Sequence, residues 1–129
     1  MHWQKGWKGH MDFYRDLILD HYRNPRNFGH LTKPDVVMEE HNVSCGDRIV
    51  MEITFDSRIK DIRFNGEGCA ISQASASMLT EKVKGLETKK ILSLRPEDII
   101  EMLGTTLTPS RVKCALLPLE VLQKAIAKV

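Results

Sequence analysis

FNGEGCAISQASAS, at residues 64–77, is the stretch in which the chain changes from strand to helix. The segment Asn65-Gly-Glu-Gly68 carries two glycines and is expected to end a strand. From Cys69 onward the residues are small and follow a helical period, which predicts a helix that ends near Gly85. This stretch therefore separates a strand-forming part of the chain from a helix-forming part.

Three strands are predicted before this stretch. The first begins with Val36 to Glu40 and can run to Val43. In the second, apolar residues alternate with mixed ones over residues 49–55, so one face of the strand is apolar. Residues 59–64 supply the third strand after a tight turn. The short connections favour an antiparallel meander of these three strands.

Helices are predicted on both sides of the strands. An apolar stripe that includes Phe13 and Leu17 predicts a helix from Asp12 that stops at Asn24-Pro25. After the central helix, we expect a short helix within residues 86–94. A further helix should open at Pro96 and end at Gly104, since proline suits a first helical position and glycine a helix end.

The last helix carries apolar residues at helical spacing up to the end of the chain. It is expected to start near or just after Cys114, because Pro118 is best tolerated in a first turn. The order of elements predicts an α+β fold, with a three-stranded antiparallel sheet and helices packed on one face. Residues 12–129 are expected to form a single domain, preceded by a flexible N-terminal extension at residues 1–11.

The composition limits the classes of function. The 129 residues carry 19 basic against 17 acidic side chains, and the basic ones are dispersed, so we expect no nucleic-acid partner. No stretch approaches the roughly 20 apolar residues that cross a bilayer, so no membrane partner is expected either. The first ten residues lack the apolar middle of a signal peptide, which favours a cytoplasmic location.

The three cysteines carry the chemistry. An odd number cannot pair completely within one chain, and cysteines in a reducing compartment often serve as metal ligands or nucleophiles. Cys45 lies between two predicted strands, Cys69 opens a helix, and Cys114 lies at or near the opening of the last helix. Helix starts favour the thiolate form, which binds metals and attacks sulfur.

Asp47 follows Cys45 by two residues, and in an extended segment both side chains point to the same face. It could add one oxygen to three sulfurs, a set that suits tetrahedral zinc or an incompletely held iron–sulfur cluster. Chemistry alone leaves an alternative open, in which two cysteines are buried structural residues and one thiol is incidental. None of the five histidines is assigned as a ligand.

Four segments carry a family resemblance: HYRNPRNFG at 21–29, SCGD at 44–47, the stretch at 64–77, and RVKCA at 111–115. Together they resemble the IscU/SufU/NifU N-terminal family of iron–sulfur cluster scaffold and sulfur-transfer proteins. The resemblance covers nearly all of residues 14–129. It implies that Cys45, Asp47, Cys69 and Cys114 bind a transient [2Fe–2S] cluster or Zn²⁺.

The resemblance also implies partners. Family members receive sulfur from a cysteine desulfurase and pass clusters to downstream apo iron–sulfur proteins. IscU proteins carry a Leu-Pro-Pro-Val-Lys segment recognised by an Hsp70-type chaperone. Here only Leu107-Thr-Pro-Ser-Arg111 represents it, which argues against that partner.

Two departures bear on the branch of the family. IscU-type scaffolds have a histidine immediately before the third cysteine, whereas this chain has Lys113, which resembles the SufU branch. SufU-type proteins usually carry an insertion between the second and third cysteines, and the step from Cys69 to Cys114 is closer to the IscU length. The sequence combines features of both branches.

Three functions are therefore expected as alternatives. The main hypothesis is a scaffold that receives sulfur and holds a transient [2Fe–2S] cluster. The second is a zinc-dependent sulfurtransferase of SufU type, in which the resemblance makes Cys114 the catalytic sulfur acceptor. The third is a zinc-stabilised adaptor without catalysis, whose closed site only holds the fold.

Overall fold

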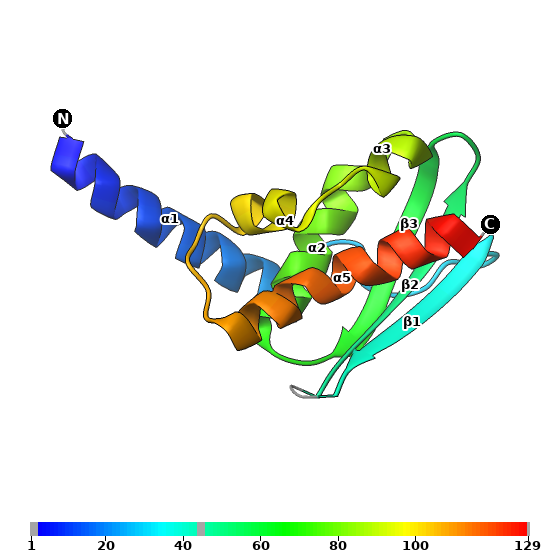
Figure 1. Ribbon diagram of the computed structural model, residues 1–129, viewed down its shortest axis with the longest axis horizontal. Helices are drawn as coiled ribbons and strands as arrows, with labels where there is room; N and C mark the ends of the chain where they lie inside the picture. The colour runs from blue at the N-terminus through cyan, green and yellow to red at the C-terminus, as the bar shows by residue number, and fades with distance from the viewer. Residues whose placement is uncertain (1–2, 44–45, 129) are drawn as a thin grey trace.

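The computed structural model describes residues 3–43 and 46–128, with side chains from residue 13 onward. Along these residues a long helix precedes a three-stranded sheet, and further helices follow it (Figure 1). The elements are α1 (Trp3–Arg23), β1 (Val36–Asn42), β2 (Asp47–Phe55), β3 (Ile59–Glu67), α2 (Ala70–Val83), α3 (Thr88–Leu92), α4 (Pro96–Leu103) and α5 (Pro109–Lys128). The predicted α+β class is confirmed.

The sheet is an antiparallel meander in the order β1-β2-β3, as predicted. Alternate residues of β2, namely Ile49, Met51 and Ile53, are fully buried, and so are Ile62 and Phe64 of β3. Figure 1 shows α2 and α5 lying along the same side of this sheet. The core therefore lies between the apolar face of the sheet and the helices, where burial of apolar side chains stabilises the fold.

The segment between α1 and β1 covers part of the opposite face of the sheet. Glu52 alternates with Met51 and Ile53 and therefore points away from the helices. Its carboxylate lies 2.6 Å from His30 Nδ1 and accepts a hydrogen bond from the Leu31 amide at 2.8 Å. These contacts satisfy a carboxylate that would otherwise be costly to bury.

The segment at residues 21–29 joins α1 to α2 through buried polar contacts. His21 Nδ1 lies 2.7 Å from Ser77 Oγ, and the backbone N–H of Arg26 donates to the same oxygen at 2.8 Å. Asn27 Nδ2 donates to Thr80 Oγ1 at 3.2 Å. The segments at 21–29 and 64–77, which both carry the family resemblance, thus contact each other and hold α1 against α2.

The first helix begins earlier than its apolar stripe predicts. α1 starts at Trp3, so the expected start at Asp12 is wrong. Once a helix is nucleated, further residues extend it at little cost in free energy, and no apolar stripe is needed for this. The division of the chain into an extension at 1–11 and a domain at 12–129 stays a prediction.

Two other element ends differ from the predictions. β3 continues through Gly66 to Glu67, although the segment from Asn65 was expected to break it. Glycine permits this pairing, because at its φ of +144° a Cβ would lie 2.0 Å from the backbone oxygen of Arg48.

α5 begins at Pro109 and contains Pro118, so the expected start near Cys114 is wrong. Pro109 suits the first turn, where a missing N–H is not needed. Pro118 has no N–H to donate to the Cys114 carbonyl four residues earlier, yet burial of its neighbours, including Leu117 and Leu122, offsets this loss.

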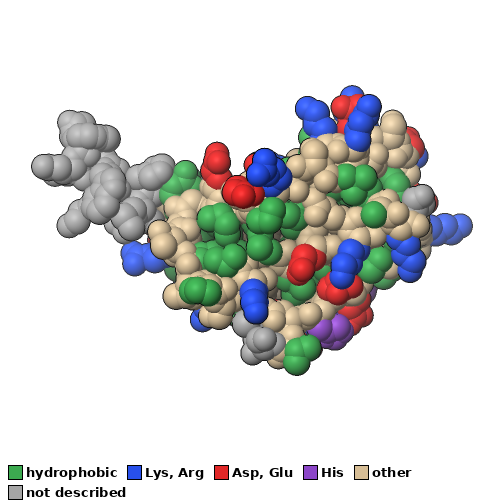
Figure 2. Space-filling model, in the orientation of Figure 1, with side chains coloured by type: hydrophobic (Ala, Val, Ile, Leu, Met, Phe, Trp, Pro, Cys, Tyr) green, Lys and Arg blue, Asp and Glu red, His purple; other side chains and the backbone are tan. Residues whose placement is uncertain are grey.

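The remaining helix predictions hold. α2 and α3 lie within the expected ranges, and α4 opens at Pro96 and ends at Gly104 in the left-handed conformation. Charges of both signs are scattered over the face in Figure 2, in keeping with a net charge of +2. Within the described residues, every helix is too short or too polar to span a bilayer.

Candidate metal centre

The first residue of β2 brings a carboxylate to one end of the sheet. Asp47 pairs with Asn42 at the end of the β1–β2 hairpin, and the neighbouring Arg48 pairs with Glu67 at the end of β3. The start of β2 therefore lies beside the point where β3 leads into α2. Asp47 is 1% exposed, and a carboxylate so deeply buried requires partners.

The backbone at the start of α2 supplies such a partner. Cys69 is the N-cap residue of α2, with an extended backbone, and its amide N–H donates to Asp47 Oδ1 at 2.9 Å. Ser72, one turn into the helix, donates from its hydroxyl to the Cys69 carbonyl at 3.1 Å. The carboxylate and the helix start therefore hold each other in place.

The third residue of the site comes from α5. Cys114 is fully buried in the second turn of that helix. The buried hydroxyl of Ser75 on α2 donates to the carbonyl of Ala115 at 2.7 Å and ties the two helices together next to Cys114. Small residues such as Ala74 and Ala76 let α2 pack closely against its neighbours.

These elements bring Asp47, Cys69 and Cys114 together. One ligand atom from each lies within 4.8 Å of the other two, and Cys69 Sγ lies 4.0 Å from Asp47 Oδ2. A tetrahedral zinc ion, with bonds of about 2.3 Å to sulfur and 2.0–2.2 Å to oxygen, would hold such atoms about 3.6 Å apart. The donor set thus fits a zinc ion after a small contraction, and thiolates are also the ligands of iron–sulfur clusters, while its role as a ligand set stays a prediction.

The surroundings of Cys69 lower the pKa of its thiol and so favour the thiolate form. Burial acts to raise its pKa, and so does the Asp47 carboxylate. The amides of Ser72 and Ile71 and the Cys114 thiol outweigh them, so the pKa of Cys69 lies below its ordinary value. The side chain makes no capping hydrogen bond, so we attribute the amides' effect to the positive field at the helix start. A partly exposed thiolate can bind a metal or attack sulfur.

Cys45, the fourth predicted site residue, lies outside the described residues. In the sequence it falls between β1 and β2, and Asp47 follows it by two residues.

The described histidines have other partners. His21 contacts Ser77, His30 pairs with Glu52, and the exposed His41 lies 2.8 Å from Glu39.

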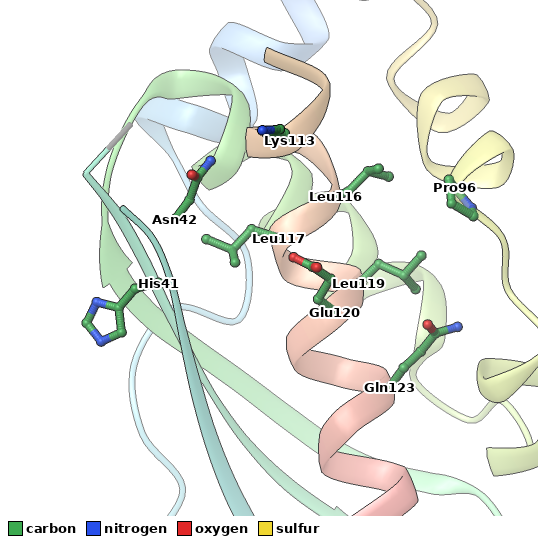
Figure 3. A pocket seen from close by; sticks show the side chains of 9 residues that line it. All are labelled: His41, Asn42, Pro96, Lys113, Leu116, Leu117, Leu119, Glu120 and Gln123. Atoms are coloured by element: carbon green, nitrogen blue, oxygen red, sulfur yellow. The ribbon is translucent and has the colours of Figure 1, made fainter. Parts of the chain in front are cut away.

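A groove lies on the outer side of α5. Lys113, next to Cys114, lines a hollow of about 420 Å³ together with Leu116 and Glu120 of α5 (Figure 3). His41 and Asn42 of β1 and Pro96 of α4 form its other sides. Lys113 is exposed, which leaves its ammonium in water.

Sequence reasoning missed the residues that support the site. Ser72 and Ser75 lie in the stretch at 64–77, but no role in the site is expected for either from the sequence pattern, which singles out only the glycine beside Cys69 for its backbone freedom. Their contacts depend on where β2 and α5 lie, which local pattern does not reveal. The available signal was the unusual number of serines in a helix that is buried along most of its length.

The chain is similar to known proteins over most of its length. The family described as "NifU-like N terminal domain" matches residues 13–129. The zinc-dependent sulfurtransferase SufU of Bacillus subtilis is 39% identical, over 89% of this chain and 90% of that protein. The iron–sulfur cluster assembly scaffold protein IscU of Aquifex aeolicus is 40% identical, over 88% of this chain and 73% of that protein.

A solved structure also matches the fold. It is the crystal structure of a candidate iron–sulfur cluster assembly scaffold protein for the SUF system from Fervidobacterium islandicum. That chain has a TM-score of 0.77 and 29% sequence identity, and the match covers 86% of this chain and 94% of that one.

Proposed function

The chain belongs to the NifU-like N-terminal domain family, and from that premise we propose that it is a scaffold for iron–sulfur cluster assembly. In this proposal it receives sulfur from a cysteine desulfurase, holds a [2Fe–2S] cluster as cargo, and yields it to apo iron–sulfur proteins. We place this activity in the cytoplasm, because a reducing compartment keeps cysteines as thiols that can serve as metal ligands.

The observation that carries the proposal is the meeting of Asp47, Cys69 and Cys114 at one point from three separate elements. Thiolates are the usual ligands of iron–sulfur clusters, and Cys45 would supply a third. Asp47 offers oxygen in place of a fourth sulfur. An oxygen ligand suits a soft metal less well, so cargo held in this way should be released readily.

Sulfur delivery follows thiol exchange chemistry. A cysteine thiolate of this chain attacks the outer sulfur of the desulfurase persulfide, the sulfur–sulfur bond breaks, and the desulfurase thiolate leaves. The attacking chain then carries the persulfide. The family resemblance favours Cys114 as the acceptor. Since Cys114 is fully buried and Cys69 is partly exposed, transfer to Cys114 requires the site to open.

Anaerobic reconstitution tests the proposal. The chain is incubated with ferrous iron, cysteine and a cysteine desulfurase, then mixed with an apo-ferredoxin. We expect visible absorbance of a cluster on this chain, followed by its transfer to the ferredoxin. A chain that folds and meets its desulfurase but never acquires that absorbance would contradict the scaffold function.

A second candidate is zinc-dependent sulfur transfer. It is favoured by the identity to SufU along almost the whole length of both proteins, and by Lys113 before the third cysteine. In this case the same four residues hold Zn²⁺, which polarises the thiolates. Retained zinc with faster desulfurase turnover, and no cluster in the reconstitution, would favour this candidate over the scaffold.

A further inference from the structure

The glycine before Cys69 occupies a place that no other residue could fill without moving the site carboxylate. Gly68 has a φ of +152°, which side chains rarely adopt. A Cβ at this position would lie 2.2 Å from Asp47 Oδ1 and 2.9 Å from Ser72 Oγ. Both distances are shorter than any ordinary contact, so the carboxylate would have to shift.

Neither neighbour of that Cβ could move without loss. Asp47 is almost fully buried, and its Oδ1 accepts the Cys69 amide at 2.9 Å. Ser72 is fully buried, and its hydroxyl bonds to the Cys69 carbonyl. A carboxylate pushed aside would break its bond to the helix start and change the direction of its second oxygen.

The two oxygens of Asp47 therefore have different tasks. Oδ1 is engaged by the Cys69 amide on the protein side, whereas Oδ2 faces the Cys69 thiol at 4.0 Å. We infer that Gly68 is a positioning residue, whose missing side chain lets the Cys69 amide hold Oδ1 so that Oδ2 alone faces the bound metal. The inference rests on the proposed function, because it concerns the same site.

The chain offers a matched control for this inference. Gly29 also has a positive φ, +134°, but a Cβ there would meet nothing within 4 Å. Gly29→Ala therefore imposes a similar backbone strain without a clash. The difference between Gly68→Ala and Gly29→Ala isolates the displacement of the Asp47 carboxylate.

The test measures Zn²⁺ affinity by competition with a chromophoric chelator, and the visible spectrum of the Co²⁺-loaded chain. Loss of a supporting group commonly weakens metal binding about 10- to 100-fold. We expect that loss and an altered Co²⁺ spectrum in Gly68→Ala, and less than about threefold loss in Gly29→Ala. In an Asp47→Ala background, Gly68→Ala should cause no further loss. Equal affinities for Gly68→Ala and Gly29→Ala would overturn the inference.

A second variant keeps the inference testable if Gly68→Ala does not fold. Asp47→Asn can still accept the Cys69 amide through Oδ1, but it presents an amide nitrogen in place of Oδ2. It should melt near the wild-type temperature in the metal-free state and lose Zn²⁺ affinity. An unchanged affinity in Asp47→Asn would overturn the inference. These readouts need no desulfurase, so failure of the proposed function in reconstitution would be seen separately.

Discussion

At the scale of the residue, the site depends on how each group is held before any metal arrives. The Cys69 amide fixes the Asp47 carboxylate, and the helix start favours the Cys69 thiolate. Cys114 is fully buried, whereas Cys69 is partly exposed. The two described cysteines should therefore differ in reactivity although their sulfur atoms are neighbours.

Alkylation of the metal-free chain tests this difference. With iodoacetamide at neutral pH, Cys69 should react several-fold faster than Cys114, because only its thiol is partly exposed. The pH midpoint of its reaction should lie below that of a free thiol, in keeping with its lowered pKa. Peptide mass spectrometry of timed samples gives both rates. Faster labelling of Cys114 would contradict this account of the site.

His21 carries a second prediction at this scale. Its burial lowers its pKa below 6.5, and the nearby Arg26 acts in the same direction, while Glu81 and Asp20 oppose them. At a pH between the two pKa values, His21 is protonated in the unfolded chain but neutral in the folded chain. The free energy of unfolding should therefore be highest above about pH 6.5 and should decrease as pH falls from there toward the lowered pKa of folded His21.

Thermal melts of the metal-free chain between pH 7.5 and 5 measure this effect. The melting temperature should fall over that range in the wild type and fall less in His21→Gln, which has no titrating group at that position. Carboxylates with lowered pKa values, such as Asp61, should act only at lower pH. Parallel curves for both chains would show that His21 is not the group responsible.

At the scale of the element, the separation of α2 from α5 sets the distance between Cys69 and Cys114. Ser75 fixes that separation through its bond to the Ala115 carbonyl. Ser75→Ala should lower the free energy of unfolding by about 0.5–1.5 kcal/mol, the usual net value of one hydrogen bond. It should also weaken Zn²⁺ binding, because the cysteines are then held less firmly.

Ser93→Ala is the matched control for that change. The Ser93 hydroxyl also donates to a backbone carbonyl, that of Lys90 at 2.7 Å, but it is exposed and remote in sequence from the cysteines. Urea denaturation should show little change in Ser93→Ala, and its Zn²⁺ affinity should equal the wild type's. Equal effects of the two variants would rule out a special role for the bond between α2 and α5.

The elements also show what the sequence could predict. Alternation in β2 and the change of period after Gly68 were enough to predict the sheet and α2, because both reflect local burial patterns. The starts of α1 and α5 were missed, since helix extension at Trp3 and tolerance of Pro118 depend on a nucleated helix and on tertiary packing. The site residues can be identified from the family resemblance, whereas their spacing in the sequence does not identify them.

At the scale of the whole molecule, the site joins β2, α2 and α5, so an ion bound there links the sheet to both helices. A ligand that binds only the folded chain stabilises it by mass action, by about 2.7 kcal/mol at 100 times its Kd. Zinc should therefore raise the melting temperature of the wild type. Cys69→Ser should lose most of this increase, and a full increase in that variant would place the zinc elsewhere.

The central claim is that Asp47 and the cysteines share one metal, and X-ray absorption spectroscopy of the zinc-loaded chain tests it most directly. We predict one zinc per chain, with sulfur scatterers at about 2.3 Å and an oxygen at about 2.0–2.2 Å. Asp47→Ala should change the oxygen contribution and leave the sulfurs in place. A zinc surrounded by nitrogen and oxygen alone, in a folded chain with reduced cysteines, would contradict the account.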